Sequence, residues 1–128
     1  MKSINYKLLL KITGLILIIV SFFFLLCLPV ALYYSEPPGP FLLSSLIALC
    51  AGLLLYFLIR KSIHEKISVR EGYLSVTMGW IVLILAGTMP YFFSGAIKGV
   101  INIFFETASG FTTTGASVVS DVEALPKS

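Results

Sequence analysis

Three long hydrophobic blocks dominate the chain, and short polar segments separate them. They extend from about 8 to 34, 41 to 59 and 73 to 93, and the first carries no charge after Lys11. About 20 apolar residues form a helix long enough to cross a hydrocarbon core of roughly 30 Å. Each block therefore predicts a transmembrane helix, and the chain is predicted to be an all-α membrane protein.

The first block follows a basic start, which is also typical of secretory signal peptides. Its apolar run is much longer than the hydrophobic region of about 7–15 residues in such peptides, and no small-residue cleavage site follows it. We therefore interpret residues 1–61 as two retained transmembrane helices.

A shorter apolar run follows the third block. Turn residues in SGAIKGV precede it, and it extends from about 100 to 110, where Gly110 can end a helix in left-handed backbone. As a helix it would measure about 16 Å at 1.5 Å per residue, half of the bilayer. Its apolar residues follow the i, i+3, i+4, i+7 spacing of one helical face: Ile101, Phe104, Phe105 and Ala108.

The segment 112–116, TTTGA, is built from β-branched and small residues that disfavour a continued helix. Extended at about 3.3 Å per residue, it covers a distance comparable to the short helix and returns the chain to the side from which it came. We therefore predict a re-entrant pore helix at 100–110, an extended loop at 112–116 and an external tail at 117–128. The alternative is an interfacial hairpin with TTTG as an external turn.

Composition and charge agree with insertion into a membrane. Hydrophobic residues make up 58% of the chain and charged residues 12%, against about 45–50% and about 25% in soluble domains. Most Lys and Arg residues lie before the first block or between the second and third. By the positive-inside rule, the N-terminus and the 62–72 loop are cytoplasmic and the Ser35–Pro40 turn is external. These positions favour topology anchors over nucleic-acid binding as the reason for the net charge of +3.

Few residues suggest catalytic chemistry. Cys27 and Cys50 stand alone within apolar spans and are expected to be small buried hydrophobes rather than disulfide partners or metal ligands. His64 is expected to be a solvated loop residue beside Glu65. No constellation of His, Ser, Asp or Cys has catalytic spacing, so we predict that the protein is not an enzyme and carries no covalent cofactor.

Backbone oxygens in the 112–116 segment are the candidate functional groups. Irregular backbone at membrane depth must be buried in protein or line an aqueous cavity, and a dehydrated cation can satisfy its carbonyls. The preceding helix would direct the negative end of its dipole to the same place. Gly115 permits backbone angles closed to other residues, and threonine hydroxyls are hard oxygen ligands that suit an alkali cation.

The stretch Phe104–Pro126, FFETASGFTTTGASVVSDVEALP, resembles the first pore loop of the Trk/Ktr/HKT superfamily of potassium transporters, and of its bacterial TrkH-type members in particular. The likeness is dense there and loose over the preceding spans. It implies potassium uptake across the cytoplasmic membrane through four pore loops in one long chain, each with one critical glycine. It also implies that 1–61 is an extra helix pair and that 73–128 is the first half of pore repeat one.

The same resemblance implies a selectivity filter in which potassium, the transported substrate, meets the backbone carbonyls of Thr113, Thr114 and Gly115. Compared with TVGYG of potassium channels, Ala116 replaces tyrosine and Ser117 replaces the second glycine, which implies fewer ion sites and weaker discrimination against sodium. The implied filter residues are Thr112, Thr113, Thr114, Gly115 and Ala116.

Glu106 lies in the predicted pore helix, where a carboxylate is a functional candidate because charge at membrane depth is costly. Two roles remain open for it. One is structural, near the outer mouth or as an acceptor of hydrogen bonds from backbone behind the filter. The other is direct contact with the ion.

The chain contains one pore loop, and Ser128 lies thirteen residues beyond the critical Gly115. We therefore expect an N-terminal fragment of a longer transporter, whose first partners are the remainder of that chain and membrane lipid. The resemblance further implies a homodimer and a cytoplasmic nucleotide-binding regulatory subunit. A small structural or assembly membrane protein without transport activity is the alternative function.

Overall fold

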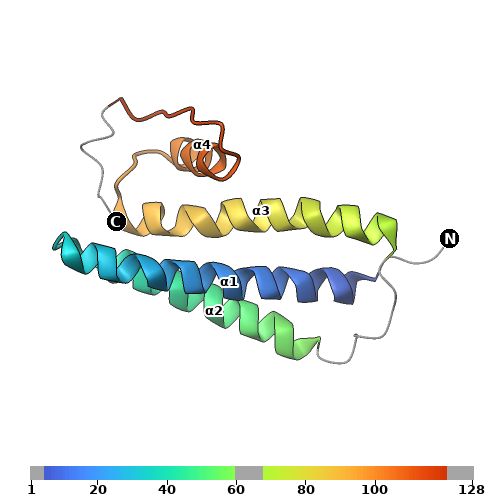
Figure 1. The fold of residues 1–128 in the computed structure, drawn as a ribbon. Helices are drawn as coiled ribbons and strands as arrows, with labels where there is room; N and C mark the ends of the chain where they lie inside the picture. The colour runs from blue at the N-terminus through green and yellow to red at the C-terminus, as the bar shows by residue number, and fades with distance from the viewer. Residues whose placement is uncertain (1–4, 60–67, 121–128) are drawn as a thin grey trace.

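The computed structural model describes residues 5–59 and 68–120, and these residues form four α-helices. The first three lie side by side and alternate in direction, while the fourth lies against the C-terminal part of the third (Figure 1). Three of them are long and apolar enough to cross a membrane, which confirms that the three hydrophobic blocks form helices of membrane-spanning length. The helices are α1 (Tyr6–Tyr33), α2 (Gly39–Leu58), α3 (Val69–Ser94) and α4 (Val100–Phe111).

Helix α3 begins at Val69, four residues before the predicted start at Tyr73. The reason is a capping box, in which the Ser68 side chain accepts from the Glu71 N–H and the Glu71 carboxylate accepts from the Ser68 N–H. Such a box satisfies two backbone donors at a helix start. Residues 69–72 therefore belong to the helix rather than to the predicted loop. Positions 62–67 of that loop, among them His64, lie outside the described residues.

The N-terminal ends of α1 and α3 are tied together by one carboxylate. Glu71 accepts from the Asn5 backbone N–H at 3.0 Å and from the Ser68 backbone N–H at 2.9 Å. Near this end, the Lys11 ammonium of α1 lies 5.2 Å from the centre of the Tyr56 ring of α2. The starts of α1 and α3 and the end of α2 therefore share one end of the bundle.

Small residues form the contacts between the long helices. A Cβ atom added at Gly52 of α2 would lie 2.8 Å from the Gly14 carbonyl oxygen of α1, so the two backbones meet directly. Near them, Ala48 is fully buried, and the Ser45 hydroxyl donates to the Ser21 carbonyl at 3.1 Å. Close backbone approach through Gly, Ala and Ser is typical of helix pairs in membranes.

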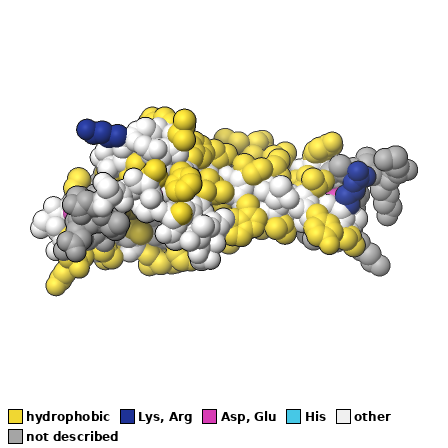
Figure 2. Space-filling model, turned by 90° about the horizontal axis from the view of Figure 1, so that it is seen from above, with side chains coloured by type: hydrophobic (Ala, Val, Ile, Leu, Met, Phe, Trp, Pro, Cys, Tyr) yellow, Lys and Arg dark blue, Asp and Glu magenta, His cyan; other side chains and the backbone are white. Residues whose placement is uncertain are grey.

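Large apolar side chains point outward instead. Leu54, Phe57 and Phe22 are each 60% exposed, and hydrophobic side chains cover much of the visible surface, with basic side chains near its two ends (Figure 2). Such a surface suits lipid, in which an exposed Leu carries no hydrophobic penalty. Cys50 also lies exposed while Cys27 is half-buried, so the expected burial is wrong for Cys50.

Candidate functional site

Helix α4 is short and rests on α3 at a glycine. Its 12 residues measure about 18 Å at 1.5 Å per residue, roughly half of what a membrane span needs. Among the described helices it contacts α3 alone. A Cβ atom added at Gly87 of α3 would overlap the Phe111 ring of α4 and lie 2.8 Å from the methyl group of Thr107. Gly87 therefore permits the close approach of the two helices.

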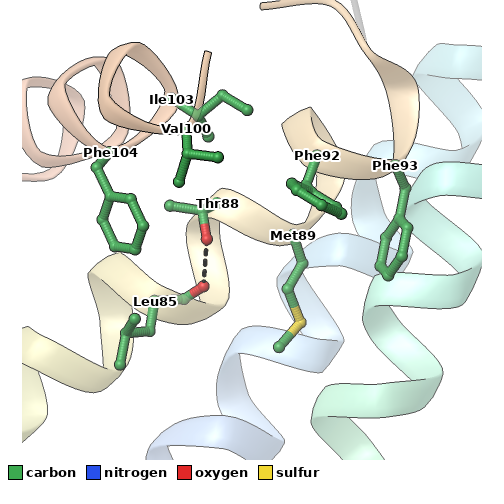
Figure 3. Close-up of a pocket in the computed structure, with 8 residues that line it drawn as sticks. All are labelled: Leu85, Thr88, Met89, Phe92, Phe93, Val100, Ile103 and Phe104. Atoms are coloured by element: carbon green, nitrogen blue, oxygen red, sulfur yellow. Dashed lines mark hydrogen bonds between the residues drawn. The ribbon is translucent and has the colours of Figure 1, made fainter. Parts of the chain in front are cut away.

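A small cavity of about 240 Å³ remains between α3 and the first turns of α4. Figure 3 shows Leu85, Met89 and Phe92 of α3 beside side chains of α4. Thr88 also lines the cavity, and its hydroxyl donates to the Leu85 carbonyl at 2.7 Å. The lining is otherwise apolar, so we interpret this cavity as a packing gap and not as an ion site.

The C-terminal end of α4 is closed by a Schellman motif. The Thr113 N–H donates to the Gly110 carbonyl at 3.2 Å, and the Thr114 N–H donates to the Ser109 carbonyl at 3.0 Å. Thr113 takes the left-handed position of this motif, with φ +56°. The prediction that Gly110 ends the helix is therefore wrong: Gly110 lies inside α4, which ends at Phe111.

The three threonine hydroxyls bond locally. Thr112 Oγ1 donates to the Ala108 carbonyl at 2.6 Å and lies 2.8 Å from Thr114 Oγ1, while Thr113 Oγ1 donates to the Thr112 carbonyl at 2.7 Å. Thr112 and Thr113 form a turn, and irregular backbone follows from Thr114. The prediction of extended backbone is therefore wrong for the first two residues of the segment 112–116.

Backbone carbonyls near Gly115 remain available to a ligand. Within the part of the chain that the structure describes, no N–H or O–H group donates to the carbonyls of Thr113, Thr114 or Gly115, and these residues are exposed. Gly115 has φ +73°, and a Cβ atom there would meet nothing within 4 Å. Backbone conformation, and not space, is therefore what requires glycine at this position.

Glu106 connects α4 to the segment beyond Gly115. One carboxylate oxygen accepts from the Ser117 hydroxyl at 2.8 Å, and the other accepts from the Val118 backbone N–H at 3.0 Å. The Ser117 hydroxyl oxygen in turn accepts from the Val119 N–H at 3.1 Å. The sequence left two roles open for Glu106. The geometry supports the structural one, in which Glu106 accepts hydrogen bonds from the loop.

A larger cavity of about 720 Å³ opens between α4 and the ends of the other helices. Phe24 and Cys27 of α1, Phe41 of α2 and Tyr91 of α3 line it, as does Glu106 of α4. Since α4 contacts only α3 among the described helices, this cavity separates α4 from α1 and α2. Glu106, whose carboxylate bonds to Ser117 and Val118, is among the residues that line it.

Sequence reasoning missed two features of this site. Gly87 carries the α3–α4 contact, and its only signal was a small Ala-Gly pair within an apolar span. Ser117 is a hydrogen-bond partner of Glu106, although the sequence suggested only that it replaces a glycine. Neither contact could be read from local periodicity, because each joins residues that are far apart in the chain or lie in different elements.

Comparison with known proteins identifies relatives over most of the chain. The family described as "TrkH: Cation transport protein" matches residues 40–128. The Trk system potassium uptake protein TrkH of Vibrio parahaemolyticus is 35% identical over 96% of this chain and 26% of its own length. The TrkH protein of Escherichia coli K12 is 36% identical over 95% of this chain and 26% of its own length. Trk system potassium uptake protein TrkG of the same bacterium is 32% identical over 77% of this chain and 20% of its own length. The chain thus spans about a quarter of the length of its TrkH relatives.

Proposed function

Because this chain belongs to the TrkH family of cation transport proteins, we propose that it supplies one of four selectivity-filter loops for potassium uptake across the cytoplasmic membrane. The loop is residues 112–116, and its central residue is Gly115. The observation that carries the proposal lies at the end of a helix about half a membrane long. There the carbonyls of Thr113, Thr114 and Gly115 accept no hydrogen bond from any described residue.

A dehydrated potassium ion would satisfy these carbonyls. Backbone oxygens replace the hydration shell of an ion in a filter, and the C-terminal end of α4 adds the equivalent of about half a negative charge. The positive φ of Gly115 lets neighbouring carbonyls turn toward a common axis. The threonine hydroxyls serve the loop itself, since all three are already engaged in local hydrogen bonds.

In this proposal α4 is a re-entrant pore helix that enters the membrane from the outer side. The turn at 95–99 would then be external, like the Ser35–Pro40 turn, and the starts of α1 and α3 would be cytoplasmic. Irregular backbone at membrane depth needs protein or an aqueous pathway around it. The remainder of the transporter chain would provide that surrounding, together with the other three loops.

Further partners follow from the family resemblance. We propose a homodimeric transporter that binds a cytoplasmic nucleotide-binding regulatory subunit, and membrane lipid around α1, α2 and α3. The names of the relatives, potassium uptake proteins of the Trk system, support potassium as the substrate. They equally support a transport function without enzymatic chemistry.

Replacement of Gly115 in the full-length transporter tests this function. A serine there would need left-handed backbone, which costs an L-residue about 1–2 kcal/mol, so the loop carbonyls should shift. We expect Gly115→Ser to reduce potassium uptake or to shift selectivity toward sodium, measured by growth of a potassium-uptake-deficient strain on limiting potassium. Gly110→Ala is the matched control, because a Cβ atom at Gly110 meets nothing within 4 Å.

Unchanged growth and selectivity of the Gly115→Ser transporter would overturn the filter assignment. That outcome would favour the alternative, a structural or assembly protein with an interfacial hairpin. Loss of growth in both variants would be resolved by measuring their amounts in the membrane. The filter assignment holds only if the Gly115→Ser transporter, present in the membrane at normal amounts, shows reduced potassium uptake or altered selectivity.

A further inference from the structure

Two fixed points hold the loop that contains Gly115. The first is the Schellman motif at its start, where the N–H groups of Thr113 and Thr114 bond to carbonyls of α4. The second is the Glu106 carboxylate, which accepts from Ser117 and Val118 just beyond Gly115. Between these points lie only Gly115 and Ala116. The path of the backbone around Gly115 is therefore set by how far apart the two points are held.

Both oxygens of Glu106 bond to the loop in this arrangement. Each accepts one hydrogen bond, at 2.8 Å and 3.0 Å, and bonds to an ionised carboxylate are about twice as strong as neutral ones. Among residues 5–59 and 68–120, no Lys or Arg forms an ion pair with Glu106. Both contacts that the structure shows for this carboxylate therefore go to the loop.

Burial on the same side of α4 agrees with a loop held down on the helix. Glu106 and Ser109 are three residues apart and share a helix face. Ser109 is only 7% exposed, although it lies about 200° around the helix from Thr107, which faces α3. The Ser109 carbonyl accepts from the Thr114 N–H at 3.0 Å, so the loop folds back onto α4 at this residue.

We propose that Glu106 is a positioning residue for ion selectivity. Its carboxylate fixes the outgoing end of the loop, and this sets the spacing of the carbonyls that distinguish potassium from sodium. This inference rests on the proposed function of the Gly115 loop. It adds that selectivity depends on a side chain which does not itself contact the ion.

The test compares variants of the full-length transporter, with potassium KM, maximal uptake rate and inhibition by sodium as readouts. Glu106→Gln keeps the shape but removes the charge. Its amide oxygen can still accept from the Val118 N–H and its NH2 can donate to the Ser117 hydroxyl oxygen, so both loop contacts become neutral and weaker. We expect about a tenfold loss in the preference for potassium over sodium, because the difference between charge-assisted and neutral hydrogen bonds is worth about this much. Glu106→Asp keeps both acceptors and should recover part of the preference. Asn102→Ala is the control on the same helix, because among the described residues the Asn102 amide bonds only to the Lys98 carbonyl one turn away.

Ser117→Ala separates positioning from direct ion contact. A positioning role predicts that it lowers potassium preference as well. It also predicts that the Glu106→Gln, Ser117→Ala double variant loses less preference than the sum of the two single losses, because effects of residues in contact are not additive. An unchanged preference in Ser117→Ala together with a large effect of Glu106→Gln would indicate direct contact with the ion and overturn the proposal. So would an unchanged preference in Glu106→Gln.

The Gly115→Ser variant, measured alongside, distinguishes the filter role of the loop from the positioning role of Glu106. A selectivity change in Gly115→Ser with none in Glu106→Gln rejects the positioning role alone. No change in either variant rejects the filter as well. Thermal stability of each purified variant identifies a general folding defect, which would lower the maximal rate without changing the preference for potassium.

Discussion

Thr113 carries the most unusual backbone in the loop. Its φ of +56° is left-handed, a conformation that is rare for β-branched residues and costs roughly 1–2 kcal/mol. Most helices that end in this motif place glycine there. Strain of this kind persists only where surrounding contacts hold it and is concentrated at functional sites, and here the Schellman bonds and the Glu106 contacts supply those constraints.

Substitutions at Thr113 test whether this strain is present. Thr113→Gly removes the steric cost and should leave the melting temperature of the detergent-purified full-length transporter equal or higher. Thr113→Val keeps the β-branch and loses the hydroxyl bond to the Thr112 carbonyl, so it should lower stability by about 1 kcal/mol. A valine variant as stable as the glycine variant would show that position 113 is not left-handed.

At the residue scale, the sequence suggested the right glycine for the loop but not the residue that ends the helix. Gly115 is the predicted loop glycine because glycine permits unusual backbone, and its φ of +73° agrees. The same preference predicts Gly110 as the helix terminator, yet Thr113 takes that position. Residue preference alone could not resolve this, because the hydrogen bonds beyond the helix end determine where it stops.

At the scale of elements, the contact between α3 and α4 depends on the missing side chain of Gly87. Phe111 and Thr107 of α4 occupy the space that a Cβ atom would need. The orientation of α4, and hence of the loop at its end, therefore depends on a residue in another helix. The hydrophobic pattern predicted α4 itself to within one residue, but it contained no signal for this packing partner.

Enlarging Gly87 should displace α4. We expect Gly87→Leu to destabilise the full-length transporter by about 1–3 kcal/mol, the usual cost of overpacking, and to impair potassium uptake because the loop moves with the helix. Gly72→Ala is the control within α3, since a Cβ atom at Gly72 meets nothing within 4 Å. Thermal unfolding and uptake should be unchanged in the control; a Gly87→Leu variant that behaves like it would argue against this contact.

At the scale of the whole molecule, the pattern of small and large residues is inverted relative to a soluble bundle. Gly14, Gly52 and Ala48 lie between the helices, while large side chains such as Phe57 face outward. The sequence predicted that three helices span the membrane because length and hydropathy suffice for that. Which helices pair, and through which residues, depended on tertiary contacts that no single span encodes.

Membrane orientation can be tested at the two ends of α3, because the start of α3 shares one end of the bundle with the start of α1. In a full-length background without Cys27 and Cys50, we expect Lys98→Cys to react with an impermeant maleimide in intact cells. Val69→Cys, 78% exposed and close to the basic loop, should react only after permeabilisation, because positive charge is retained on the cytoplasmic side. Permeabilised cells control for reactivity at both sites. Labelling of position 69 in intact cells would show that the bundle has the opposite orientation. Helix α4 would then enter the membrane from the cytoplasm, where its loop could not serve as the outer filter of an uptake system.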